Sequence, residues 1–520
     1  MPKNNSARSV RFAKNVVWSL SGQVCVMALS FFLTPYLIHK LGLQVYGVYI
    51  ILNAVAGYLL LMSFGASPTI VKFLSEFAAA EDSEKIRRAV GYSLALHTAG
   101  PALGSLAVGL GAKFLIVRVF HVSGALVPVG VFTLRCLAVA GVAVSLTAWA
   151  SSVLAGLQIF KWQSIIYVAQ SGLMVSGAAL AVAAGLGIRG IARWYAALNV
   201  GLCFLALSIA ASSLKPLWRR AAAAPEGYGF KTFGGYGLSM WLGQIAWIVT
   251  YQFDKIFLAR GTSIAGMTLY SVPAGLLQRF QFFPSAVATV LIPVISEAFV
   301  RESSSEIKRL YLKTLRGILW TILPIYIFLF AVMPQFLGLW LGGSFSSASV
   351  WPARFLVLAQ IVLMLNYVPT AVAIGGGKPL YTSYVVWGQA VISVIAWKLL
   401  IPHYGIGGAG FGSLLAQLIP DFIYLGFVHD RILSLDWREY FADGLHAPFV
   451  CGALLAVGLL SVHSWLDTWP KLVVSGVLGG AVFLACGRAI AGEEDRRTLE
   501  MLWDNALSYR RPGGKQYRRR

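Results

Sequence analysis

The chain has 520 residues, of which 58% are hydrophobic and only 12% are charged. Soluble domains carry about 25% charged residues, so this composition excludes an ordinary soluble enzyme, a coiled coil and a disordered protein. It predicts an all-α polytopic membrane protein. The 42 lysines and arginines outnumber the 20 aspartates and glutamates, which gives a formal net charge of +22, and the positions of these charges decide what the excess means.

About fourteen apolar stretches are long enough to cross a membrane, since a span needs about 20 apolar residues. The first follows a short basic segment and is too long for a signal peptide, so we expect a retained span. The stretch 264–298 is unusually long, and Pro273, Pro284 and Pro293 predict that it is tilted or broken. The predicted spans are 15–39, 46–72, 89–112, 128–154, 163–187, 191–214, 233–259, 264–298, 316–341, 352–374, 380–401, 406–428, 446–466 and 470–491.

The basic residues orient the chain. With the N-terminus in the cytoplasm, the cytoplasmic segments hold about 30 of the 42 lysines and arginines, against about nine in the outer segments. An even number of spans returns the C-terminus to the cytoplasm. The expected location is therefore a bacterial inner (plasma) membrane with both termini cytoplasmic. The charge excess indicates contact with anionic lipids rather than with nucleic acid.

The chain contains an internal repeat. Gly22-Gln23 matches Gly243-Gln244, and Ser75-Glu76 matches Ser296-Glu297, at an offset of about 220 residues. Because six spans is an even number, the halves form two six-helix lobes in a parallel repeat, with a pseudo-two-fold axis along the membrane normal and two extra C-terminal helices. The expected divisions are a cytoplasmic N-terminus (1–14), an N-lobe (15–214), a cytoplasmic linker (215–232), a C-lobe (233–428), a cytoplasmic loop (429–445), the extra spans (446–491) and a basic cytoplasmic tail (492–520).

Asp254 is one of few acids within the spans. It lies near the outer end of the seventh span, and polar and aromatic residues at helical spacing share its face. Such a stripe is expected to face the protein interior or water. Asp254 is therefore either a cavity or cation-coupling residue, or the partner of Lys255, Arg260 or Arg279 in an ion pair that only holds helices together.

Arg279 lies near the middle of the eighth span, between Gln278 and Gln281. A charge at this depth costs at least about 2.5 kcal/mol, so Arg279 needs a partner, water or an anionic ligand. It is the strongest candidate for a substrate-path residue. Arg135 lies nearer the outer surface, where its side chain either reaches water or lines the same path.

Three further acids are candidates for coupling or gating. Asp421 shares a helix face with Gln417 and is either a coupling carboxylate or the partner of a basic residue. Glu76 and Glu297 occupy matching positions at the inner ends of their spans. They form either a gating ion pair between the lobes or a pair of solvated interfacial residues.

Two residues of the second span, Tyr49 and Asn53, either pack in the core or contact sugar. No nucleotide-binding P-loop is present, and the histidines lack metal-ligand spacing. We therefore expect neither a metal nor a cofactor, with a cation gradient or the membrane potential as a possible source of energy. The predicted outer loops are also too short and too poor in acids for a glycan-transferring enzyme.

Several motifs keep their order and spacing along the chain: TPYLIHKLG at 34–42, YGVY at 46–49, FDKIFLA at 253–259, IPVIS at 292–296, GGGK at 375–378 and GIGGA at 405–409. This pattern resembles the polysaccharide transporter branch of the MOP flippase superfamily, which includes the O-antigen and exopolysaccharide repeat-unit flippases. The resemblance implies a two-lobed bundle that carries a lipid pyrophosphate-linked oligosaccharide, usually on undecaprenol, to the outer leaflet. It also implies that Arg279, with Arg135 and Lys255, contacts the anionic head group. Transport in this superfamily is driven without ATP.

The predicted function is thus a secondary transporter for O-antigen, exopolysaccharide or capsule biosynthesis that works by alternating access. Its partners would be the lipid-linked glycan, anionic membrane lipids and polysaccharide polymerase or assembly proteins. One alternative is a multidrug or cation antiporter of the same superfamily, although that function favours an acidic cavity. Another is an enzyme or scaffold in a polysaccharide assembly complex.

Overall fold

The fold is known from a computed structural model that describes residues 24–218, 229–301, 304–490, 492 and 495–496. Throughout these residues the regular secondary structure is helical and no strand occurs, so the all-α prediction is confirmed. The predicted N-terminal segment 1–14, most of the linker 215–232 and nearly all of the tail 492–520 lie outside the described residues.

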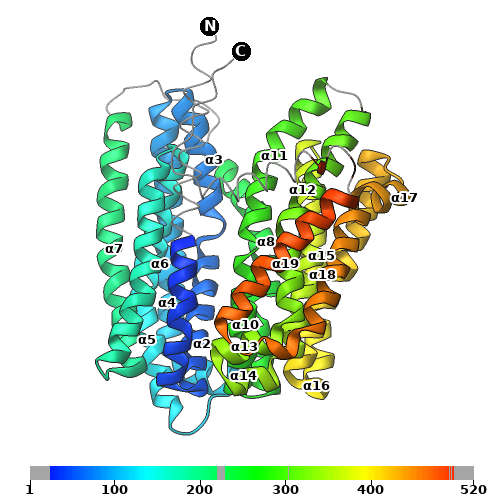
Figure 1. Ribbon diagram of the computed structural model, residues 1–520. Helices are drawn as coiled ribbons and strands as arrows, with labels where there is room; N and C mark the ends of the chain where they lie inside the picture. The colour runs from blue at the N-terminus through cyan, green and yellow to red at the C-terminus, as the bar shows by residue number, and fades with distance from the viewer. Residues whose placement is uncertain (1–23, 219–228, 302–303, 491, 493–494, 497–520) are drawn as a thin grey trace, which may run out of the picture. The chain divides into compact units, whose positions relative to one another are not determined.

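The first of two compact units comprises Met1–Ser271 and Ile401–Ile406. Inside it, α5 packs against α4, α6 and α7, and Figure 1 shows these helices side by side. Buried apolar residues such as Ile70, Phe73 and Val153 form its core. The helices are Val24–Leu41, α2 (Leu43–Leu60), α3 (Ala66–Ala79), α4 (Ser83–Phe114), α5 (Leu126–Gly156), α6 (Phe160–Ala183), α7 (Gly187–Trp218), α8 (Phe230–Gln252), α9 (Asp254–Gly261) and the first half of α10 (Ile264–Arg279).

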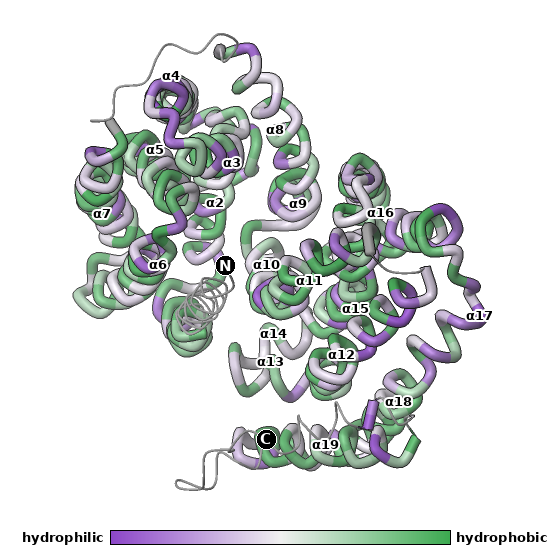
Figure 2. Tube along the Cα trace, turned by 90° about the horizontal axis from the view of Figure 1, so that it is seen from above, coloured by the Kyte–Doolittle hydropathy of each residue, from purple (hydrophilic) through white to green (hydrophobic). Residues whose placement is uncertain are grey.

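The second unit comprises Val272–Leu400 and Gly407–Arg520. Here α15 packs against α11 and α12, and the predicted extra helices α18 and α19 pack against α12, at the edge of the unit in Figure 2. Its helices after α10 are α11 (Phe282–Arg301), α12 (Ser304–Ala331), α13 (Met333–Leu341), α14 (Gly343–Ala348), α15 (Val350–Gly375), α16 (Leu380–Val428), α17 (Trp437–Glu439), α18 (His446–Ser461) and α19 (Trp469–Ile490).

This division falls inside α10, whereas the repeat predicted it at the linker 215–232. The reason is that α8 packs against α2 and α3 in the first unit. The lobe boundaries remain a prediction, because the two units are defined by contacts between residues, whereas the predicted lobes are defined by the repeat in the sequence.

Twelve helices of the described residues are long and apolar enough to cross a membrane, so the chain is a multi-pass membrane protein. The predicted count of fourteen stays a prediction. Two predicted spans, 380–401 and 406–428, fall within the single helix α16, which is kinked at Gly405. The predicted span 233–259 falls on α8 and α9, which are not among the twelve.

The internal repeat is visible in two turns of the backbone, after α5 and after α15. The N–H of Ile159 donates to the carbonyl of Leu154 at 2.8 Å, and the N–H of Lys378 donates to the carbonyl of Ala373 at 2.8 Å. The residue before each donor is left-handed, with φ of 59° in the first turn and 74° in the second. The two turns lie about 220 residues apart, in agreement with the repeat, although the same helix-ending motif also follows α3 and α6.

Two spans are broken inside the membrane region. The second predicted span breaks at Phe64 and Gly65, which have φ of 50° and 71°, and α10 ends before a turn at 280–281. Pro68 and Pro284 are each the third residue of the helix that follows. Because proline has no N–H to donate to the fourth residue before it, the helix can begin only in the few positions that precede it. The predicted interruption of 264–298 is thus confirmed as a break.

Candidate functional site

Asp254 and Lys255 form a buried ion pair at the break between α8 and α9. The Lys255 Nζ lies 2.8 Å from the Asp254 Oδ1, and the same oxygen accepts the backbone N–H of Lys255 at 2.9 Å. Lys255 Nζ also donates to the carbonyl of Tyr251 at 2.6 Å. The residues are only 4% and 8% exposed. Each charge is neutralised locally, as the ion-pair interpretation expected, so a coupling role for Asp254 would require this pair to open.

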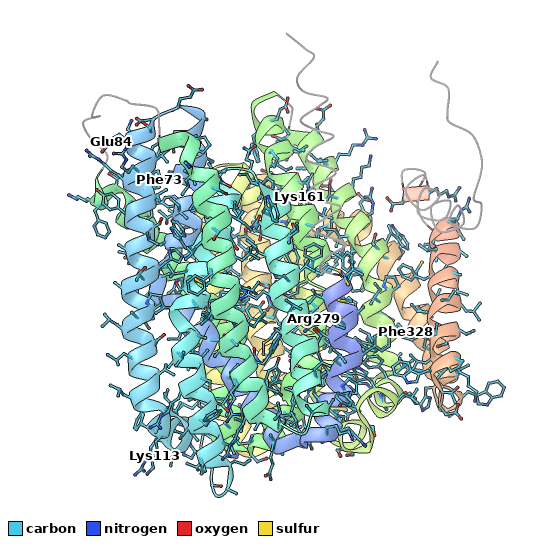
Figure 3. All side chains as sticks on the ribbon, turned by 90° about the vertical axis from the view of Figure 1, so that its left-hand side faces the viewer. Phe73, Glu84, Lys113, Lys161, Arg279 and Phe328 are labelled. Atoms are coloured by element: carbon cyan, nitrogen blue, oxygen red, sulfur yellow. The ribbon has the colours of Figure 1, made fainter. Side chains whose placement is uncertain are left out.

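Arg279 ends α10 immediately before the break, and its side chain is exposed. Figure 3 shows it at mid-height, between the levels of Lys161 and Lys113. Gln278 is half-buried, and Gln281 donates from Nε2 to the Oε1 of Gln360 on α15 at 2.8 Å. The break therefore places a guanidinium beside two amides. A guanidinium is well suited to bidentate contact with phosphate oxygens.

Asp421 lies in a cage of amides within the second unit. Its Oδ1 accepts from the Nε2 of Gln389 at 2.7 Å, and its Oδ2 accepts from the Nε2 of Gln417 at 2.5 Å. Asn366 of α15 also bonds to it, and the residue is 1% exposed. Amides thus occupy the place where one interpretation expected a basic partner. A buried carboxylate held only by neutral donors can bind a proton or a cation at low cost, because no ion pair has to be broken.

The remaining candidates of the first unit are less tightly held. Asn53 is exposed and donates from Nδ2 to the carbonyl of Tyr49 on the same helix at 2.9 Å. Tyr49 is half-buried and stacks near Tyr46, with ring centroids 5.5 Å apart. Arg135 is exposed on α5. Core packing or sugar contact for Tyr49 and Asn53, and contact of Arg135 with water or the substrate path, stay predictions.

The predicted gating acids lie in different units. Glu76 is exposed on α3 in the first unit, and Glu297 is exposed on α11 in the second. Their equivalent positions near the helix ends agree with the sequence match. A gating role for either residue stays a prediction.

Several buried polar contacts of the first unit were not predicted. The indole N–H of Trp241 donates to the carbonyl of Leu61 at 2.7 Å, at the end of α2. The hydroxyl of Tyr58 donates to the carbonyl of Gln252 at 2.9 Å, at the end of α8. The only sequence signal for these contacts was a polar group within an apolar stretch, which does not identify the partner helix.

His97 is a second missed feature. It is 1% exposed on α4, and its two ring nitrogens contact the Ser93 carbonyl at 2.8 Å and the Ser67 hydroxyl at 2.9 Å. Ser67 is the second residue of α3, directly after the break in the second span. The sequence showed only a histidine without metal-ligand spacing.

A cavity of about 650 Å³ lies in the second unit, beside the chain that follows α19. Arg316 on α12 donates from Nε to the Oδ1 of Asp495 at 2.7 Å, and Trp320 donates to the other carboxylate oxygen at 3.3 Å. Basic and acidic side chains balance in its wall, so it lacks the positive excess that a pyrophosphate would require. The charged lining residues are Lys308, Arg309, Arg316, Glu439, Asp443 and Asp495. Among the described residues, no group of three metal-binding side chains comes together.

A family model described as polysaccharide biosynthesis protein matches residues 12–299, more than half of the chain. The chain belongs to the polysaccharide biosynthesis protein family. No curated protein matches this family member. Its fold is shared with the lipid II flippase MurJ in an inward closed conformation, at 13% identity and a TM-score of 0.67, over 95% of this chain and 99% of that chain.

The family member also shares its fold with an inward-facing multidrug resistance MATE family transporter of the MOP superfamily. The identity is 14% and the TM-score 0.65, over 80% of this chain and 98% of that chain. Such low identities show the fold alone. Together with the family match, they confirm the resemblance to the polysaccharide transporter branch of the MOP flippase superfamily, and they assign this polysaccharide biosynthesis protein to a fold of membrane transporters.

Proposed function

We propose that the protein is a secondary transporter that flips a lipid pyrophosphate-linked oligosaccharide repeat unit, carried on a polyprenol such as undecaprenol, across a bacterial inner membrane. The glycan would serve O-antigen, exopolysaccharide or capsule biosynthesis. The observation that carries the proposal is Arg279. Arg279 is an exposed guanidinium at the break between α10 and α11, and a guanidinium is well suited to bidentate contact with the oxygens of a pyrophosphate.

The proposed cycle follows from charge. Binding of the pyrophosphate head to Arg279 would favour one state of the bundle. Release of the head on the outer side would return the bundle to its starting state. Arg135 is an accessible second contact. Lys255 is a weaker candidate, since it is already paired with Asp254 at 2.8 Å. Asp421 would bind the coupling cation, driven by a gradient or by the membrane potential.

The test is flipping of a fluorescent lipid pyrophosphate-oligosaccharide in proteoliposomes. Losing a charge-assisted hydrogen bond costs about 1.5–3 kcal/mol, so Arg279→Ala is expected to slow flipping about tenfold or more. Arg279→Lys should retain part of the rate. Lys398→Ala removes another exposed basic residue of a predicted span and is the matched control. Normal flipping by Arg279→Ala at equal protein levels would overturn the assignment.

The MATE-like fold makes a multidrug or cation antiporter the second candidate. That function predicts transport of lipophilic cations, which the same liposomes measure by dye efflux. Efflux without glycan flipping would replace the proposal. A membrane enzyme or scaffold of an assembly complex makes a different prediction: catalysis retained in detergent for the enzyme, or loss of function only when a partner protein is missing for the scaffold.

The proposed orientation places both termini in the cytoplasm and the basic tail near anionic lipids. Polysaccharide polymerase or assembly proteins are the expected protein partners. Membrane-impermeant labelling of single cysteines tests the orientation. In intact cells, a cysteine placed in the basic tail of the protein should react with the reagent only after the membrane is opened. A cysteine that replaces Asp467 in the predicted outer loop should react without opening the membrane.

A further inference from the structure

His97 is a titratable residue that the proposed transport cycle does not use. The Ser93 carbonyl can only accept a hydrogen bond, so the Nδ1 of His97, 2.8 Å away, must carry a proton. In the neutral ring the Nε2 then accepts from the Ser67 hydroxyl at 2.9 Å. Both nitrogens are therefore occupied, and the hydrogen-bond network assigns a single neutral tautomer.

The surroundings of the ring contain hydroxyl, carbonyl and indole groups but no charge. The elements packed against α4 are α2, α3, α5, α7, α8 and the short helices Leu61–Ser63 and Leu115–Val119. Of these, α3 presents Ser67 to the ring, and α5 presents Trp149, which donates to the Ser93 Oγ at 3.0 Å. Within the described residues no carboxylate or cation acts on His97. A proton added to this ring would thus create an unpaired buried charge.

The same face of α4 fits closely against the break in the second span. Gly100 lies one turn after His97, and a Cβ at Gly100 would lie 1.8 Å from the carbonyl oxygen of Met62. Ser67, the partner of His97, is the second residue of the helix after the break. α4 therefore contacts both sides of the break, through His97 and Ser67 on one side and through Gly100 and Met62 on the other.

We propose that His97 is a proton-binding site that controls the break between α2 and α3. In the closed arrangement the neutral ring is held by Ser67 and Ser93. Protonation turns the Nε2 from an acceptor into a donor. The Ser67 hydroxyl must then rotate so that its hydrogen no longer points at the Nε2. The charged ring gains hydration only when the break opens, so proton uptake favours the open arrangement. That this opening drives substrate movement rests on the transport function proposed above.

The test is hydrogen exchange of the backbone amides of residues 61–69, followed from about pH 7.5 to about pH 5, because a hydrated imidazole titrates near pH 6.5. If opening takes up one proton, the opening constant rises about tenfold for each pH unit below that value. Protection factors in wild type should fall accordingly. In His97→Gln, which keeps a neutral side chain able to contact Ser67, they should be independent of pH.

His429 supplies the matched control, since it is also a fully buried histidine and bonds to Tyr311 at 2.9 Å in the other unit. His429→Gln should leave the pH dependence of 61–69 unchanged, and Ser67→Ala should keep it because the ring still titrates. An absence of pH dependence in wild type, or its persistence in His97→Gln, would overturn the proposal. An absence of pH dependence in wild type overturns the proposal even if His97→Gln does not fold.

Because hydrogen exchange needs no substrate, it separates this site from the proposed function. Where flipping is observed, a proton gradient should change its rate in wild type and not in His97→Gln. If the exchange result holds but the gradient acts equally on both proteins, His97 is a proton site of the break and its link to substrate movement is wrong.

Discussion

The indole N–H of Trp241 lies 2.7 Å from the carbonyl oxygen of Leu61 and caps the end of α2. A contact in the opposite sense joins the same helices, because the Tyr58 hydroxyl donates to the carbonyl of Gln252 at the end of α8. Each helix thus supplies a donor to the other at the point where that other helix is interrupted. In a membrane, where water is scarce, such donors are the available partners for backbone at a break.

Trp241→Phe is expected to destabilise the protein by about 1 kcal/mol, since it keeps an aromatic ring and removes only the donor. Tyr58→Phe should have a similar effect through Gln252. Thermal unfolding in a fixed detergent measures both. Trp247→Phe, which changes an exposed tryptophan of the same helix, should alter the stability by less than about 0.5 kcal/mol. Equal effects at Trp241 and Trp247 would contradict the capping role.

Gly100→Ala should destabilise the protein by about 2–3 kcal/mol, because the new methyl group would meet the backbone of Met62 rather than a flexible side chain. Gly91 offers the control on the same helix, since a Cβ there meets nothing within 4 Å. Gly91→Ala should be neutral or stabilise by up to about 1 kcal/mol through helix propensity. The unfolding temperatures of the two variants are the measurement, and equal effects at Gly100 and Gly91 would contradict a tight fit at Gly100.

Asp82 caps the N-terminus of α4 and gives a pH-dependent prediction. Its carboxylate accepts the backbone N–H of Lys85 at 3.0 Å and lies 3.0 Å from the Lys85 Nζ, and these contacts lower the pKa of Asp82 below its ordinary value. A lowered folded pKa adds stability above the unfolded pKa, near 3.9, and this is lost as the pH falls through the folded pKa.

Asp82→Ala should therefore cost about 1 kcal/mol at neutral pH, and the difference from wild type should shrink as the carboxylate is protonated. Chemical denaturation of the two proteins at neutral and acidic pH measures this. Asp467→Ala, which removes an exposed acid paired with Lys471 at 2.6 Å, should have little effect at either pH. A difference at Asp82 that persists at acidic pH would show that its charge is not responsible.

Asp421→Asn should destabilise the second unit by about 1–3 kcal/mol, because its new NH₂ group must face a donor of Gln389 or Gln417. Adding Gln389→Glu restores an acceptor to the cage and should recover at least part of that stability. A double variant that is stable but no longer responds to a cation gradient would place the coupling carboxylate at position 421. Failure of Gln389→Glu to restore any stability would contradict the hydrogen-bond assignment.

The sequence was sufficient to predict the helical fold, most spans and the likeness of the two halves, because long apolar stretches and their spacing need no knowledge of packing. It also offered an ion pair as one of two interpretations for Asp254, whose partner is its neighbour in the chain. The bond from Trp241 to Leu61 joins residues 180 positions apart. No periodicity predicts such a bond, since it depends on which helices become neighbours.

The break before α11 shows a similar limit. Pro284 correctly indicated an interruption, but the turn lies at 280–281, because a proline is tolerated within the first helical turn and only forbids its continuation backwards. For the cage around Asp421, Gln389 was visible as an amide within an apolar stretch. Its direction towards the carboxylate was not, because α16 folds back on itself only at the kink of Gly405.

The matching turns after α5 and α15 have an evolutionary consequence. They share hydrogen bonds and a left-handed residue, although over 153–159 and 372–378 only a valine and a glycine keep their identity. The path of the backbone is thus the same at both turns although most side chains differ. Duplication of a gene about half as long would leave such a turn at both positions.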